Sequence, residues 1–164
     1  MLQVLGRAGR FRLGESFELW HVDRTRLADA ATLDDTVVFS GSAHHQIYAD
    51  DDNGQHFVAL TTVDDALGQM TVHSLGSGDL ARSVSAAIGY FDDTEARDST
   101  EVARLLSAAS LHVRALWLPE SSSVYVLHAP ERRIEGRGGP HSAPDLLHYL
   151  QVLATRIPSG RHTR

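Results

Sequence analysis

The pair Asn53-Gly54 constrains the fold of this 164-residue chain more than any other short feature. Asn-Gly favours a two-residue turn because both positions tolerate positive φ angles, and strand-like runs lie on either side of it. The pair therefore predicts a β-hairpin, and a two-residue turn also fixes its register. The expected opposing pairs are Asp52 with Gln55, Asp51 with His56, Ile47 with Leu60, and His45 with Thr62.

The spacing of apolar residues predicts further strands and changes to a helical period after residue 78. The expected strands are residues 17–22, 36–40, the two arms of the hairpin, 69–75, 111–118 and 123–129. The expected helices are residues 23–33, residues 79–91, a helix capped by Asp98 with Val102, Leu105, Leu106 and Ala109 on its apolar side, and a last helix from Pro144 to Pro158.

This order of elements indicates an α+β fold. Consecutive strands with short connections favour an antiparallel β-meander, and we expect the helices to pack on one face of that sheet. The chain has no internal repeat and no long linker, so residues 1–164 are expected to form a single domain. The ends, residues 1–14 and 159–164, are expected to be flexible.

The series of three strands, a helix, two strands and a helix is similar to that of the type III secretion chaperone-like fold. The resemblance concerns architecture alone and rests on no residue motif. It implies a role in binding other proteins, which is an argument by analogy of fold.

Composition excludes several kinds of chemistry. The chain has no cysteine, which removes thiol nucleophiles, disulfides and thiolate metal sites, and its fifteen basic residues are all arginine. Without lysine there is no Schiff-base chemistry and no phosphate-loop lysine. The net charge of −6 makes nucleic acid an unlikely partner. No apolar run approaches ~20 residues and no secretory signal is recognisable, so we expect no membrane partner and a cytoplasmic location.

The hairpin holds the densest polar cluster, and most of it cannot form one site. His45 and Asp51 lie about 20 Å apart along an extended strand, too far to share a metal ion. The expected register leaves Asp51 and His56 as one close pair, with His44 as a further ligand if the strand bulges. The pair has three interpretations: a solvated hydrogen-bonded pair, half of an acid–base system, or two metal ligands that lack a third.

A second candidate is the turn Gly76-Ser77-Gly78, which joins an expected strand to an expected helix. Such a turn can present backbone N–H groups to an anion at a helix N-terminus. Asp79 would oppose the anion, and the acidic residue that a dinucleotide fingerprint requires about 20 positions later is missing. The segment therefore predicts a turn that eases the chain into a helix, with weak anion binding as the alternative. No G-x-S-x-G or H-E-x-x-H motif supports a hydrolase.

The third candidate is a pair of aromatic residues, Trp117 and Tyr125, on the last two expected strands. They either pack in the core or form an exposed aromatic edge for dimerisation or for a peptide that adds to the sheet.

Two functions remain open. The first is a non-enzymatic protein-interaction or adaptor module that binds a protein partner or self-associates, and it is the one we favour. The second is a metal-dependent or His/Asp acid–base enzyme centred on residues 45–56. No cofactor is expected for the favoured function.

Overall fold

The computed structural model describes the backbone of residues 10–50, 56–66, 69–77, 79–96 and 100–157, and the side chains of residues 14–46, 79–96 and 100–157. The strands are β1 (Arg10–Val22), β2 (Val37–Asp50), β3 (His56–Ala66), β4 (Gln69–Ser77), β5 (Arg104–Ala108), β6 (Val113–Leu118) and β7 (Ser123–His128). The α-helices are α2 (Asp79–Asp93) and α3 (Ala143–Arg156), and the short 3-10 helices are η1 (Arg24–Asp29), η2 (Asp34–Thr36), η3 (Ala109–Leu111) and η4 (Arg132–Ile134).

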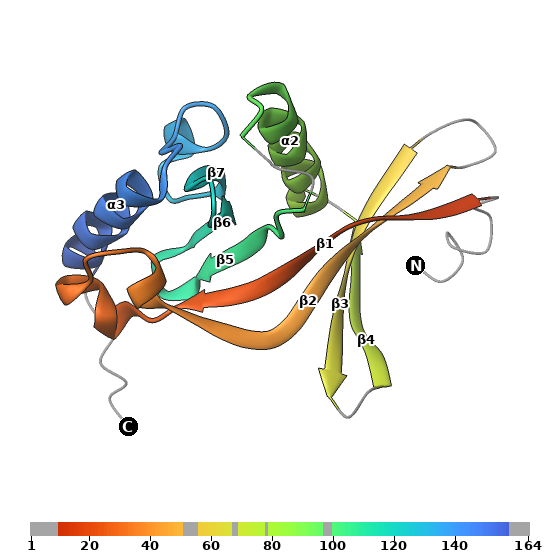
Figure 1. Ribbon diagram of the computed structural model, residues 1–164, viewed down its shortest axis with the longest axis horizontal. Coiled ribbons are helices and arrows are strands. Elements are labelled where there is room, and N and C mark those ends of the chain that lie inside the picture. Colours follow the sequence, from red (N-terminus) through yellow and green to blue (C-terminus); the bar gives the residue numbers. More distant parts are fainter. Residues whose placement is uncertain (1–9, 51–55, 67–68, 78, 97–99, 158–164) are drawn as a thin grey trace.

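The α+β class is confirmed, but the expectation of a purely antiparallel meander is wrong. The strands form one mixed sheet in the order β4-β3-β2-β1-β5-β6-β7 (Figure 1). Strands β1 and β5 are neighbours and run parallel, with Leu19 opposite Leu105 and His21 opposite Ser107. A parallel pair requires a long crossover, and here that connection includes α2.

The expected helix after Asp98 is also wrong, because residues 104–108 form strand β5. Leu105 and Leu106 are both buried although they point to opposite faces of the sheet. A strand that is covered on both faces has an almost continuous apolar sequence, which resembles the stripe of a short helix. The helix over residues 79–91 and the last helix are confirmed as α2 and α3.

Helices lie on both faces of the sheet, so the expectation of helices on one face is wrong. Trp117 and Val126 belong to a core that includes Leu150 of α3. Leu116 belongs to a second core that includes Phe91 of α2. The alternation of side chains along each strand sends neighbouring residues into different cores. Figure 1 shows β6 and β7 between the two helices.

Each helix is fixed by a specific set of contacts. Buried Ala81, Val84, Ala87 and Phe91 recur at three- and four-residue spacing along α2. Helix α3 begins after Ser142, whose side chain accepts a hydrogen bond from the backbone N–H of Asp145. The side chain of Gln151 on α3 donates to the carbonyl oxygens of Leu27 and Ala30, at 2.9 and 3.2 Å, and so joins α3 to η1.

The hairpin forms, but its register differs from the expectation by one residue. Asp50, rather than Asp51, pairs with His56, and Ile47 pairs with Ala59. Strand β2 ends at Asp50 and β3 begins at His56, so five residues separate the paired strands instead of two. Because side chains alternate, a shift of one residue changes which residues of the two strands share a face.

Two other expectations were that the ends of the chain are flexible and that the chain has no membrane-spanning segment. Strand β1 begins at Arg10, within the segment 1–14 that was expected to be flexible, and the division into one domain with flexible ends stays a prediction. Among the described residues, no helix has the length and apolar character to cross a bilayer.

Candidate functional site

Strand β2 has a stretch with a neighbour on one side only. Its pairing with β1 extends to Val37, whereas its pairing with β3 begins at Ser42. Residues Val37–Ser40 therefore have no strand on their outer side within the part of the chain that the structure describes. We call this stretch the open edge. Alternate residues of such an edge direct their backbone N–H and C=O groups away from the sheet.

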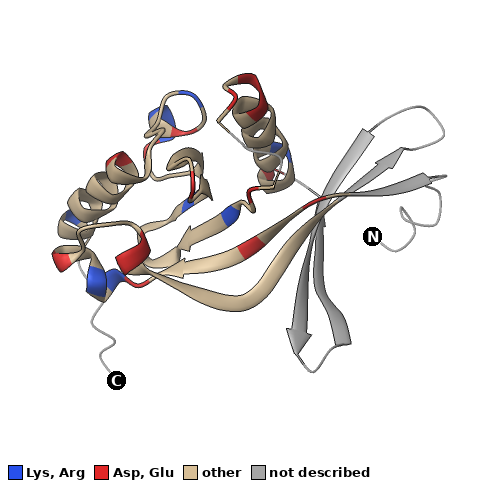
Figure 2. Ribbon diagram, in the orientation of Figure 1, with Lys and Arg blue, Asp and Glu red and all other residues tan. Residues whose placement is uncertain are grey.

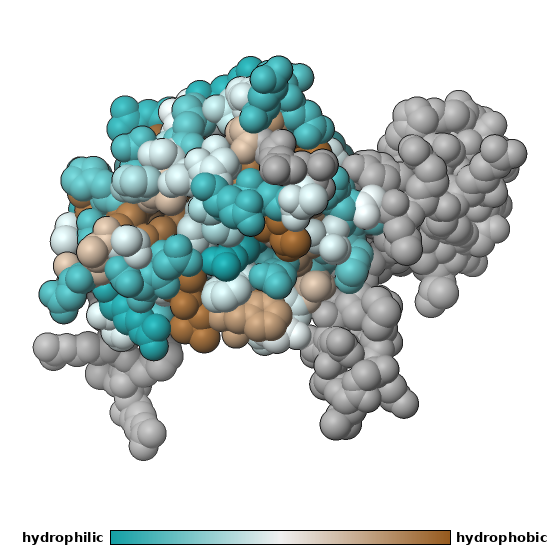
Figure 3. Space-filling model, in the orientation of Figure 1, coloured by the Kyte–Doolittle hydropathy of each residue, from teal (hydrophilic) through white to brown (hydrophobic). Residues whose placement is uncertain are grey.

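The open edge also carries exposed apolar side chains. Val38 is 44% exposed and Phe39 is 47% exposed, and they are two of the three exposed large hydrophobic residues in the described part of the chain. As consecutive strand residues they point to opposite faces of the sheet. Figure 3 shows brown and tan atoms along the lower border of the described surface, where Figure 1 places β2.

Neighbouring side chains hold Phe39 in place. Its ring lies 5.3 Å from the ring of Trp20 between centroids, and the two residues pair across β1 and β2. The guanidinium group of Arg104 lies 4.2 Å from the ring centroid of Trp20 and forms a 3.1 Å ion pair with Asp34. The aromatic surface beside the open edge is therefore supported from β1, β5 and η2.

The opposite edge of the sheet, at β7, is covered by the segment that follows it. The N–H of Val124 donates to the carbonyl of His141 at 2.9 Å, and the N–H of Gly136 donates to the carbonyl of Val126 at 2.8 Å. Isolated bridges join Val126 to Gly136 and Ser123 to Ser142. We call this the closed edge, since the outward N–H of Val124 and carbonyl of Val126 already have partners.

Trp117 and Tyr125 are not an exposed aromatic edge. Trp117 is 2% exposed and Tyr125 is 9% exposed, and they lie in the cores on opposite faces of the sheet. Strand β6, which carries Trp117, has neighbours on both sides. Core packing, the other interpretation that the sequence allowed, describes both residues.

A second feature is a line of polar residues across the sheet, on the face that α2 covers in part. His21 of β1 is opposite Ser107 of β5, Ser107 is opposite Arg114 of β6, and Arg114 is opposite His128 of β7. Directly opposed residues share a face of the sheet. We call these four residues the polar row. Two positions away on β1, β5 and β6 the same face is apolar, at Leu19, Leu105 and Leu116.

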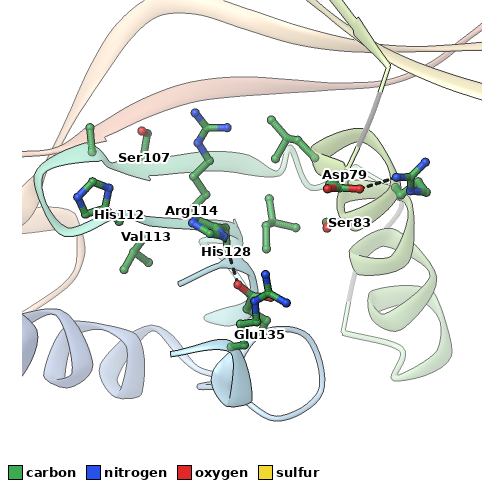
Figure 4. Close-up of a pocket in the computed structure, with 13 residues that line it drawn as sticks. Asp79, Ser83, Ser107, His112, Val113, Arg114, His128 and Glu135 are labelled. Atoms are coloured by element: carbon green, nitrogen blue, oxygen red, sulfur yellow. Dashed lines mark hydrogen bonds and ion pairs between the residues drawn. The ribbon is translucent and has the colours of Figure 1, made fainter. Parts of the chain in front are cut away.

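Much of the polar row lies in a cleft with a volume of about 800 Å³. Figure 4 shows its residues arriving from α2, from β5, β6 and β7, and from the segments around η3 and η4. Its polar and charged lining consists of Asp79, Arg82, Ser83, Ser107, His112, Arg114, His128, Arg132 and Glu135.

The two carboxylates of the cleft already have partners. Asp79 forms an ion pair with Arg82 at the start of α2. Glu135 lies 3.2 Å from Nδ1 of His128, and the same carboxylate oxygen accepts a hydrogen bond from the N–H of Ala129 at 3.0 Å. The carboxylate of Glu135 therefore fixes both the histidine and the chain that covers the closed edge.

Arg114 differs from these groups. Among the described residues it has neither an ion pair nor a side-chain hydrogen bond, although its two neighbours in the polar row are polar. Acidic residues gather instead at the far end of α2, at Asp92 and Asp93 (Figure 2). No serine of the cleft hydrogen-bonds a histidine in the described part of the chain, so the pair that activates a serine nucleophile is missing there.

The charge of Arg114 also acts on His44 of β2. Burial lowers the pKa of His44, and the positive charges of Arg114 and of His45 lower it further. His44 lies opposite Phe17, which is part of the core under α2. The neutral form of the imidazole is thus favoured in the folded protein.

The polar cluster of the hairpin cannot be assembled from the described residues. Asp51 lies outside them, the backbone of His56 belongs to β3, and His44 is a half-buried residue of β2. No group of three potential metal ligands occurs among the residues that the structure describes. An acid–base or metal role for Asp51, His56 and His44 stays a prediction, without the direct pairing of Asp51 and His56 that suggested it.

The glycine-containing turn is in part a strand. Gly76 and Ser77 belong to β4 and pair with Leu60 and Ala59 of β3, whereas Gly78 lies outside the described residues. Weak anion binding at this segment stays a prediction.

Neither the open edge nor the polar row was predicted from the sequence, for different reasons. The strand that contains Val38 and Phe39 was expected, but its lack of an outer neighbour depends on where β3 begins to pair. The sequence does contain a sign of the polar row. Each of the strands β1, β5, β6 and β7 has a polar residue near one end, at His21, Ser107, Arg114 and His128. Only the pairing of the strands places these residues in one line.

Comparisons with known proteins give no family and no relative. No protein-family model, no curated protein and no solved structure matches the chain. The observed order is four strands, a helix, three strands and a helix, which differs from the order that suggested a type III secretion chaperone-like fold.

Proposed function

We propose that the chain is a non-enzymatic, cytoplasmic protein-interaction module that binds an extended segment of a partner protein along the open edge. One observation carries the proposal: unpaired strand backbone coincides with exposed Val38 and Phe39. Proteins usually protect such edges because they pair with other chains. Residues 134–143 cover the closed edge at β7, whereas the open edge on β2 carries exposed apolar side chains.

The geometry favours a short strand as the occupant. The backbone of an added strand would take up the outward N–H and C=O groups, and its side chains would alternate between Val38 on one face and Phe39 on the other. The open edge is four residues long, from Val37 to Ser40, and lies between η2 and the start of the β3 pairing. That length suits one extended segment with apolar or β-branched residues on both faces.

The proposal is tested by selecting peptides of about six residues, a typical strand length, from a display library against the purified protein. We expect selected peptides to have apolar residues on both alternating faces. Phe39→Lys should weaken their binding about tenfold, because burial of the exposed part of an aromatic ring contributes roughly 1 kcal/mol and the charge adds a desolvation cost.

Val102→Lys is the matched control. Val102 is 55% exposed, more than Phe39, but it precedes β5 and lies away from the open edge. Its substitution should leave peptide binding unchanged. Binding should also slow amide hydrogen exchange within residues 37–40 and leave β7 unaffected. Equal losses in the two lysine variants, or protection elsewhere in the sheet, would contradict the proposal.

Self-association is a distinguishable outcome. If light scattering shows a dimer that Phe39→Lys dissociates, the open edge pairs with a second copy and the proposed partner segment is wrong. A monomer that binds the selected peptides supports the proposal.

A further inference from the structure

We propose that the cleft beside α2 binds a small organic phosphate, at a site separate from the open edge. The residue that carries the inference is Arg114, which stands in the polar row between Ser107 and His128. It has no counter-ion among the described residues, in a chain whose net charge is −6. An arginine that remains unpaired in an acidic protein, with polar neighbours on both adjacent strands, is a natural partner for an anion.

The charges around Arg114 leave the cleft positive. Three arginines line it, and they come from separate elements: Arg82 from α2, Arg114 from β6 and Arg132 from η4. Its two carboxylates, Asp79 and Glu135, are engaged by Arg82 and His128. With the histidines counted as neutral, three positive and two negative side chains leave one unit of positive charge.

The placement of the donors favours phosphate over carboxylate. A carboxylate lies in one plane and is satisfied by one guanidinium fork, whereas the oxygens of a phosphate point in several directions. Donors reach the cleft from α2, from the sheet and from the segment after β7, and they include the hydroxyl groups of Ser83 and Ser107 (Figure 4).

The size and the remaining lining favour an organic group attached to the phosphate. A volume of about 800 Å³ exceeds what one phosphate ion fills and lies within the range of small-molecule sites. Leu80 and Leu127 supply apolar contact beside the charged groups, and the exposed ring of His112 lies at the border of the cleft. We therefore expect an apolar or planar body to bind together with its phosphate.

The test is a set of titrations followed by NMR and calorimetry, with phenyl phosphate, inorganic phosphate and benzoate as probes. Phenyl phosphate should bind best and should shift the amide signals of Ser107, Arg114 and His128. Arg114→Gln should weaken it roughly tenfold or more, as expected when a charge-assisted hydrogen bond is lost. Arg26→Gln, an identical change on η1, should have no effect because Arg26 pairs with Asp23 away from the cleft.

Each alternative result overturns part of the inference. If benzoate bound as tightly as phenyl phosphate, the inferred preference for phosphate would be wrong. If inorganic phosphate bound as tightly, the inferred organic part of the ligand would be wrong. If a phosphoserine tetrapeptide bound more tightly than phenyl phosphate, the ligand would be a phosphorylated protein and not a small molecule. Absence of all binding, or equal losses in the Arg114 and Arg26 variants, would exclude the site. Phe39→Lys should leave phenyl phosphate binding unchanged, so the site and the proposed function fail independently.

Discussion

Two edge segments of the sheet, strand β7 and residues 37–40 of β2, are built in opposite ways. At the closed edge, the outward backbone of β7 is hydrogen-bonded to the segment that follows it, through Gly136 and His141. At the open edge, Val38 and Phe39 are exposed beside backbone that has no outer partner in the described part of the chain. A covering segment thus follows β7, whereas none of the described residues covers Val37–Ser40, and this difference makes the open edge a candidate for binding.

The largest effect is expected from breaking the closed edge at Gly139. A Cβ atom there would collide with the backbone carbonyl oxygen of Ile134, which cannot move without displacing the covering segment. We expect Gly139→Ala to lower the free energy of unfolding by about 2 to 4 kcal/mol, in the range of substitutions that strain the backbone. Denaturant unfolding measures the loss, and amide exchange at Val124 and Gly136, whose N–H groups join β7 to the covering segment, should accelerate.

Gly89→Ala is the control for this prediction. Gly89 lies in α2, and a Cβ atom there meets nothing within 4 Å. Alanine should leave stability unchanged or increase it by about 0.5 to 1 kcal/mol, because glycine is unfavourable within a helix. If Gly139→Ala proved as stable as Gly89→Ala, the covering segment would not depend on its close approach to Ile134.

A smaller effect is expected from the carboxylate that fastens the same segment. Glu135→Ala removes the acceptor of the Ala129 N–H and the partner of His128, which should cost about 1 to 2 kcal/mol. Glu135→Gln keeps a carbonyl acceptor and should recover part of the loss. Thermal unfolding of both variants, with the exposed Glu120→Ala as a control, measures the difference. Equal stability of all three proteins would show that Glu135 does not hold the closed edge.

Local patterns predicted the elements whose character is visible in one stretch of sequence. The helical spacing of Val84 and Phe91 identified α2, and Pro144 identified the start of α3. Alternation identified β6 and β7, and Asn53-Gly54 identified the hairpin that joins β2 and β3. These signals act over a few residues, so they do not depend on the order of strands in the sheet.

The errors arose where distant segments decide the structure. Leu105 and Leu106 are buried because β5 lies in the centre of a sheet with helices on both faces, which no local period indicates. Phe39 is exposed because β3 begins to pair only at Ser42. Arg114 forms part of a site only because the register sets it beside Ser107 and His128. Both proposed surfaces are thus products of strand order and register.

The smallest effect concerns β2, the strand that carries the open edge. Because burial and the charge of Arg114 lower the pKa of His44, the unfolded chain takes up a proton at higher pH than the folded protein does. The stability that neutral His44 contributes is fully present above the pKa of the unfolded chain, about 6.5. It is lost as pH falls toward the lower pKa of the folded protein. His44→Gln should therefore flatten the acid side of the stability–pH curve.

Thermal unfolding between neutral and mildly acidic pH measures this effect, with His148→Gln, an exposed histidine of α3, as the control. A parallel NMR titration should show the pKa of His44 rising in Arg114→Gln, because one of the charges that lower it is removed. An unchanged titration would mean that Arg114 does not act on β2. A rise would link the arginine of the cleft to the strand that carries the open edge, and would show that the charge of Arg114 reaches β2.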